Sequence, residues 1–130
     1  APALLDKGPP RAAAALLHLP LLHIETRPDA WRAWFAAHGV ETGPVTGMLY
    51  DQFATITQAA LHGLGVALLP DYLAEQDLAT GRLVRAWGDA TESPGAYHLV
   101  WPIGKSHDPA LRRFRDWLAG QAEDEDPLPR

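Results

Sequence analysis

The sequence predicts an α/β domain with a parallel or mixed sheet, and three features of residues 51–70 support that fold class. Apolar residues recur near one face at helical spacing, at Phe53, Ile56, Ala60 and Leu64. Gly63 and Gly65 are expected to end this helix, because glycine tolerates the positive φ angles of a helix exit. Residues 66–69 form a short, uninterrupted apolar run, typical of a strand covered on both faces.

Similar patterns predict the elements before this stretch. Residues 1–20 are rich in alanine and proline, which favours a short helix among loops. Residues 20–24 are expected to form a strand. Pro28 suits the first position of the next helix, which Gly39 ends. The aromatic side chains of this helix fall at helical spacing, at Trp31, Trp34, Phe35 and His38. Residues 45–50 predict a second strand.

Residues that cap helices or interrupt strands predict the elements around and after the central helix. Asp51 is expected to cap the central helix, and Pro70 to stop the strand that follows it. Residues 72–76 predict one or two helical turns, and residues 82–87 predict a strand.

The last third of the chain predicts a loop, a strand and a helix. Residues 88–95 contain loop-forming residues, and residues 96–103 read as a strand with alternating side chains. The residues of that strand expected to share one side are Tyr97, Leu99 and Trp101. Asp108, which precedes a proline, is a strong helix start, and Arg112 is expected to pair with Asp116 across one turn. The buried stripe of this helix is expected at Leu111, Phe114 and Leu118.

Length and composition bound the class of protein. The length of 130 residues is typical of a single domain. We expect this domain over residues 1–122, followed by an acidic, proline-containing, disordered tail over residues 123–130. A hydrophobic content of 47% with five Trp excludes a disordered chain. The net charge of −5 argues against direct binding of nucleic acid, since phosphate contacts need clustered Lys and Arg. The absence of Cys excludes disulfides and fits a cytoplasmic protein, and neither a signal sequence nor a membrane-spanning run is evident.

Catalysis has little support in the sequence. No nucleophile elbow, phosphate-binding glycine loop or zinc-protease motif is present, and the only serines, Ser93 and Ser106, lie in predicted loops. Three acidic residues cluster around a predicted turn, where a solvated surface explains them: Asp71, Glu75 and Asp77. The six His lack metal-ligand spacing, so we expect neither a metal nor a cofactor, and we expect the chain not to be an enzyme.

Two strand-to-helix junctions favour a binding function instead. In open α/β sheets, ligands bind beyond the carboxyl ends of the strands, where helix N-termini present free amides. The first junction contains Thr26 and Arg27, and the second contains Asp51, Gln52 and Phe53. We expect both to line one crevice that a small metabolite occupies. Each residue also has a structural alternative: a turn for Thr26, a helix cap for Asp51, which is the favoured reading, and core packing for Phe53.

Four segments in register resemble the effector-binding region of LysR-type transcriptional regulators. The central segment reads QAALHGLGVALLP and is followed by the spacer DYLAEQDLATGRLVRAW. The other segments read PLLHIETRPDAWRAWFAAHG, GAYHLVWP and LRRFRDWL, and together the four span most of the chain. Within the family, the chain is most similar to the subgroup of glycine-cleavage and β-lactamase regulators.

The resemblance implies a periplasmic-binding-protein-like (type 2) effector domain, here mainly the second lobe plus the elements that return to the first. It places both junctions at the mouth of the interlobe cleft, where a small effector binds. It also implies effector sensing at Tyr97, although packing is the favoured alternative there. Arg27 itself could meet an anionic effector, although a solvent-facing side chain is the favoured alternative for an arginine beside a helix start. Gln52 and Phe53 depart from the small hydroxylated residues that are frequent in the family, so the effector's chemistry stays open.

The resemblance also implies partners. A small-molecule effector and a second copy of the chain are expected, and DNA is expected only through a winged helix-turn-helix that nothing in this chain matches. No membrane partner is expected. The alternative is a solute-binding protein of related fold that serves a transporter. The upstream coding sequence distinguishes the two, because a winged helix-turn-helix supports regulation and a signal peptide supports transport.

Overall fold

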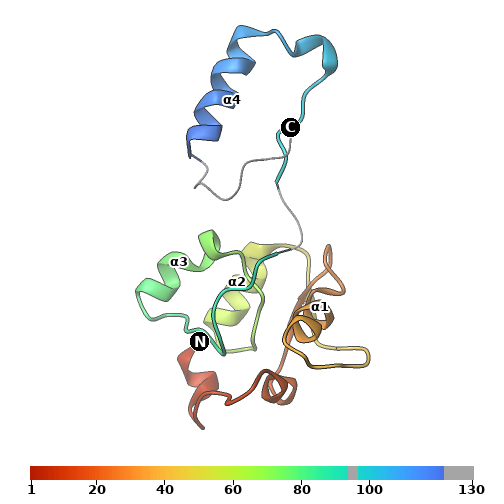
Figure 1. Cartoon of the computed structure of the whole chain (residues 1–130). Helices are drawn as coiled ribbons and strands as arrows, with labels where there is room; N and C mark the ends of the chain where they lie inside the picture. Colours follow the sequence, from red (N-terminus) through yellow and green to blue (C-terminus); the bar gives the residue numbers. More distant parts are fainter. Residues whose placement is uncertain (94–96, 122–130) are drawn as a thin grey trace. The chain divides into compact units, whose positions relative to one another are not determined.

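A computed structural model of the protein describes residues 1–93 and 97–121 (Figure 1). The chain divides into two compact units, Ala1–Glu92 and Ser93–Arg130, and each is described by itself. The elements of the first unit are η1 (Pro2–Leu5), η2 (Ala13–His18), β1 (Leu22–Ile24), α1 (Ala30–Ala37), β2 (Met48–Tyr50), α2 (Phe53–Leu61) and α3 (Asp71–Ala79). The second unit contains η3 (Ile103–Lys105) and α4 (Pro109–Gln121).

A small parallel sheet forms the centre of the first unit. β1 pairs with β2 in parallel, with Ile24 opposite Tyr50, which confirms the two predicted strands, each shorter than predicted, in a sheet of the expected kind. On the other side of β1, Leu21 forms a single parallel bridge with Val66, whose N–H donates to the Pro20 carbonyl at 2.9 Å. The predicted strand over 66–69 is therefore wrong in extent, because only Val66 takes part in a described backbone ladder.

Helices α1 and α2 pack against opposite faces of this sheet. Leu22 packs with Ile56 of α2 in one buried cluster, and Leu21 packs with Trp31 and Phe35 of α1 in the other. Successive side chains of a strand point to opposite faces, so two neighbouring leucines serve two separate cores. The first unit therefore has the layered helix–sheet–helix arrangement that the sequence predicts.

Helix α1 confirms the predicted aromatic pattern, although its start differs from the prediction. Trp31 and Phe35 are buried, and Gly39 follows the helix with φ +73°, as a helix exit requires. The helix begins at Ala30, with Asp29 as its N-cap residue, so Pro28 lies outside rather than at the first helical position. The Asp29 carboxylate does not cap the helix but pairs with Arg32 at 2.9 Å.

The two glycines after α2 have different roles. Gly63 adopts φ +75° at the helix exit, as predicted. Gly65 does not have a positive φ. A β-carbon there would lie 2.5 Å from the Pro20 carbonyl oxygen and 2.8 Å from Leu22 Cδ2. Gly65 therefore allows close approach to the chain entering β1, and the prediction that it breaks the helix is wrong.

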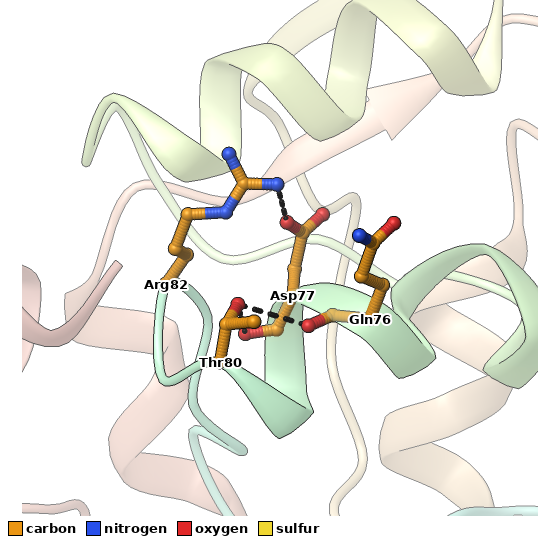
Figure 2. Close-up of polar contacts among 4 residues, drawn as sticks. All are labelled: Gln76, Asp77, Thr80 and Arg82. Carbon is orange, nitrogen blue, oxygen red and sulfur yellow. Dashed lines mark hydrogen bonds and ion pairs between the residues drawn. The ribbon is translucent and has the colours of Figure 1, made fainter.

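Helix α3 is longer than predicted, and an ion pair holds the segment that follows it (Figure 2). Asp77 is only 7% exposed, and its carboxylate pairs with Arg82. The Leu83 N–H also donates to the Asp77 carbonyl at 3.0 Å, and the Thr80 hydroxyl donates to the Gln76 carbonyl at 2.9 Å. Two predictions are wrong: residues 82–87 form no strand, and Asp77 is buried rather than on a solvated surface.

This buried carboxylate gives a testable prediction. The substitution Arg82→Gln removes the charge partner of Asp77, and we expect it to lower the free energy of unfolding by about 1–3 kcal/mol. In that background, Asp77→Asn should recover part of the loss, because an uncharged amide costs less to bury unpaired. Urea unfolding of the two single variants and the double variant measures the coupling between the residues. Additive losses would contradict the ion pair.

The second unit contains one predicted element and lacks another. Helix α4 begins where predicted, with Asp108 Oδ1 accepting the N–H groups of Ala110 at 2.8 Å and Leu111 at 3.2 Å. Residues 97–102 form no strand, because a strand needs a ladder partner and none occurs among the described residues. Asp116 pairs with neighbouring Arg115 at 2.9 Å, so its predicted pairing with Arg112 is wrong.

The apolar stripe of α4 differs from its prediction as well. Leu111 is half-buried, but Phe114 is 48% exposed and Leu118 is 39% exposed, and no residue of α4 is buried. Within the second unit, these side chains form an exposed apolar face. The predicted tail over 123–130 lies outside the described residues.

Candidate functional site

The two strand-to-helix junctions lie together at one edge of the sheet. Ile24 and Tyr50 are opposite each other in the parallel register, so both strands end at the same level. The Glu25 N–H donates to the Tyr50 carbonyl at 2.8 Å, which extends the contact one residue beyond β1. The segments 25–27 and 51–53 therefore leave the sheet side by side, which is the arrangement that parallel strands predict.

Arg27 and Phe53 connect the two junctions through their side chains. The Arg27 Cζ lies 5.7 Å from the centroid of the Phe53 ring, within the range of a cation–π contact. Phe53 also packs against the buried cluster of Leu22 and Ile56, so it contributes to the core and presents its ring to Arg27. Phe53 therefore packs in the core, which is one of the two alternatives that the sequence offers, and its ring also contacts Arg27 of the other junction.

Asp51 does not cap α2, so this prediction is wrong. The N-cap residue is Gln52, and no side chain caps the helix. The Asp51 carboxylate instead lies 3.3 Å from the Thr55 hydroxyl, which also lies 2.9 Å from the Gln52 carbonyl. The cap position is one residue later than the sequence pattern suggested. The first N–H groups of α2 are left without a side-chain acceptor, as in helix starts that bind anions.

The remaining candidates lie in two different units. Thr26 is exposed within a turn that the Arg27 N–H closes by donating to the Ile24 carbonyl at 3.0 Å. Gln52 is exposed at the neighbouring junction. Five of the six candidates are therefore gathered at one edge. Tyr97 belongs to the second unit, where it is 78% exposed.

A hollow of about 290 Å³ lies at the start of α1, next in the chain to Arg27. Pro28, Asp29 and Arg32 line it on the helix side, and residues 42–45 line the other. The Thr42 hydroxyl oxygen is buried there and has no hydrogen-bond partner among the described residues. Sequence analysis did not single out Thr42, and its only sequence signal is the glycine–proline turn that follows it.

Two further classes of site were searched for over residues 1–93 and 97–121. No three His, Asp or Glu side chains of these residues gather as ligands for a metal ion. None of the helices in these ranges has the length and apolar character needed to cross a membrane.

Comparison with known proteins assigns the family. Residues 1–123 match the LysR substrate binding domain. The chain is 39% identical to the HTH-type transcriptional regulator TrpI of Pseudomonas aeruginosa, over 84% of this chain and 37% of TrpI. It is 41% identical to the HTH-type transcriptional activator AmpR of Rhodobacter capsulatus, over 74% of this chain and 33% of that protein. The chain thus spans about a third of the curated relatives it matches.

A solved structure agrees with these relatives. The effector domain of the transcriptional regulator AmpR of Pseudomonas aeruginosa superimposes with a TM-score of 0.78 at 29% identity, covering 92% of this chain and 57% of that chain. The AmpR effector binding domain of Citrobacter freundii gives a TM-score of 0.68 at 25% identity, covering 93% and 60%. The chain belongs to the LysR substrate-binding domain family and has its type 2 periplasmic-binding-protein-like α/β fold.

Proposed function

We propose that this chain is the effector-sensing portion of a LysR-type transcriptional regulator, and that the effector binds where β1 and β2 end. The observation that carries the proposal is the hydrogen bond from Glu25 to Tyr50, which brings the two junctions to one edge. The transcriptional regulators among its relatives favour this function over the solute-binding alternative and over an enzyme. A regulator of this kind is expected in the cytoplasm.

The chemistry of the edge favours an effector with a carboxylate. The Arg27 guanidinium and the uncapped N-terminus of α2 both favour a negative group. Thr26 and Gln52 supply hydrogen-bonding groups around it, and Phe53 supplies an apolar wall. The Asp51 carboxylate favours a second, positively charged group on the effector, such as the ammonium of an amino acid. Tyr97 remains a candidate contact from the second unit.

Effector binding would regulate transcription by a population shift. The effector favours the arrangement of lobes or subunits to which it binds more tightly, and the shift is limited by that difference in affinity. DNA would be bound by a helix-turn-helix that no segment of this chain matches. In a dimer of the chain, this change in arrangement would alter the positions of two DNA-binding domains.

A thermal-shift screen tests the effector class. The panel contains amino acids, aromatic acids and muropeptides, each with a carboxylate, and the methyl esters or amides of the same compounds, which lack the carboxylate charge. A compound present at about 100 times its Kd should raise the unfolding midpoint by about 10 °C. The analogue without the carboxylate charge should give little shift. Equal shifts for acids and esters, or none for any acid, would contradict a carboxylate site at this edge.

A substitution at Arg27 tests the position of the site. Arg27→Gln removes the guanidinium, and we expect the Kd of the acid found in the screen to rise about tenfold or more, because a hydrogen bond to a charged group is lost. Isothermal titration calorimetry measures this change. The matched control is Arg11→Gln, at an exposed arginine of the same unit that belongs to neither junction. A Kd that is unchanged by Arg27→Gln, or raised equally by both variants, would exclude the proposed position.

A further inference from the structure

The first unit contains a second hollow, lined by different residues from those of the two junctions. Its volume is about 150 Å³. Residues of η1, α2 and α3 contribute to its walls, together with the segments 65–69 and 83–86 that follow the two helices. The described residues of this lining include none from 25–27 or 51–53. The hollow is therefore separate from the effector edge.

The walls of this hollow are mainly apolar. Leu69 and Leu78 are half-buried in its lining, and Leu83 is 7% exposed. Among the described residues, the charged side chains of the lining are Asp71 and Arg85, and both are exposed to solvent. A water molecule held inside a protein needs about two to four polar partners. The lining therefore favours an apolar occupant over water.

Small side chains leave this space open. Ala60, Ala67 and Ala74 belong to the lining, where leucine or valine would occupy part of the volume. Gly65 also belongs to it, and no larger residue fits there, because a β-carbon would lie 2.5 Å from the Pro20 carbonyl oxygen. Native cores contain few voids larger than a water molecule, so a space of this size is unusual.

Backbone hydrogen bonds hold two of the walls in place. The Val66 N–H donates to the Pro20 carbonyl at 2.9 Å, and the Leu22 N–H donates to the Val66 carbonyl at 2.9 Å. The wall after α3 is held by the Leu83 N–H, which donates to the Asp77 carbonyl at 3.0 Å. A void persists where the structure around it cannot relax into it. These bonds therefore keep the space available to a ligand.

We propose that this hollow binds a small apolar ring of about the size of benzene, as a second ligand site of the domain. In a protein interior, an apolar cavity of about 150 Å³ stays dry and binds benzene or xenon. The site takes an uncharged ligand and does not depend on the effector site proposed above. Residues 83–86 lead toward the boundary between the two units at Glu92, so a bound ring would also hold the start of that connection.

A titration followed by backbone amide chemical shifts tests the binding. Fluorobenzene is the probe, and pyrazine, a ring of similar size with two polar nitrogens, is the matched control compound. We expect a Kd of about 1 mM or lower for fluorobenzene, with the largest shifts at the Ala74 and Leu83 amides. Pyrazine should bind at least about tenfold more weakly, because its nitrogens lose hydrogen bonds with water. Equal Kd values, or shifts that do not saturate, would overturn the proposal.

A substitution that fills the hollow tests its position. Ala74→Leu places a larger side chain in the lining, and we expect the Kd of fluorobenzene to rise at least about tenfold. Ala79→Leu is the matched control, because Ala79 is exposed on the same helix and lies outside the lining. If the two variants bind fluorobenzene equally well, the ring does not occupy this hollow.

Unfolding in urea shows whether the space exists. Ala59 is 6% exposed in the same unit but does not line the hollow, so Ala59→Leu should lower the urea midpoint by overpacking. Ala74→Leu should leave the midpoint unchanged or raise it, because the added atoms fill a void. A chain with Ala74→Leu that fails to fold, or unfolds at or below the midpoint of Ala59→Leu, would contradict the hollow.

The unmodified chain supplies a further measurement. Nuclear Overhauser contacts are expected between the ring protons of bound fluorobenzene and the methyl groups of Leu78 and Leu83, which line the hollow. Exchange of the Leu83 amide should also slow at saturating fluorobenzene, because the ring packs against the wall that this amide holds. Contacts to other methyl groups alone, with unchanged exchange at Leu83, would refute the site.

Discussion

Replacing Trp31 with alanine is expected to lower the free energy of unfolding by about 3–5 kcal/mol, enough to remove most of the stability of a small domain. Trp31 is 2% exposed and packs against Phe35 with ring centroids 5.6 Å apart. Its indole N–H also donates to the Leu22 carbonyl at 2.8 Å, which ties α1 to β1. The substitution therefore removes the largest buried side chain on this face and leaves a strand carbonyl without its partner. Urea unfolding followed by circular dichroism measures the loss.

Trp31→Phe separates the two contributions. Phenylalanine keeps most of the apolar contact and loses only the hydrogen bond to Leu22, so a loss of about 1–2 kcal/mol is expected. Ala36→Ser, on the exposed side of the same helix, should change stability by less than about 0.5 kcal/mol. If Trp31→Ala unfolds at the same urea concentration as Ala36→Ser, then α1 does not pack on the sheet as described.

The parts of the fold that sequence predicts well are those whose pattern is local. The spacing of Trp31 and Phe35, or of Phe53 and Ile56, has the helical period whatever the rest of the chain does. The parallel order of β1 and β2 also follows, because a helix connects them. From that order the meeting of Arg27 and Phe53 at one edge could be anticipated, although their cation–π contact could not.

The failed predictions depend on partners that a local pattern does not reveal. Residues 82–87 and 97–102 have strand-like composition, but a strand exists only where a second backbone completes its ladder. The apolar stripe of α4 predicts burial, yet burial requires a surface to pack on, and Phe114 stays exposed. Asp77 is the opposite kind of error, because a residue predicted to be exposed is buried. Its burial depends on an ion pair with Arg82, which lies beyond the next turn of the chain.

The predicted N-cap residue of α2 was wrong for a different reason. Asp51 has the residue type of a cap, and the sequence cannot show that the N-cap position falls one residue later, at Gln52, with the helix beginning at Phe53. This shift bears on the proposed effector site, because it leaves the helix start without a side-chain acceptor. The effector site residues themselves remain predictions that the binding experiments test.

Gly47→Ala is expected to disrupt the sheet itself. A β-carbon at Gly47 would lie 1.9 Å from the Leu21 carbonyl oxygen and 2.8 Å from His23 Cδ2. The first of these atoms is backbone, so it cannot move aside without separating β2 from β1. We expect a loss of about 3 kcal/mol or more, at the upper end of what overpacking costs. Thermal unfolding measures it, and hydrogen exchange should show lost protection at the Glu25 amide, which bonds to Tyr50.

Gly43→Ala is the matched control for this prediction. A β-carbon at Gly43 meets nothing within 4 Å, and its φ is not in the positive range. Alanine there should leave stability unchanged or raise it by up to about 1 kcal/mol, because it restricts the unfolded chain. Both glycines lie in the connection that leads from α1 to β2, so the difference between the two variants isolates the contact with Leu21. If Gly47→Ala is as stable as Gly43→Ala, the two strands do not approach as closely as described, and the edge that joins the two junctions is placed wrongly.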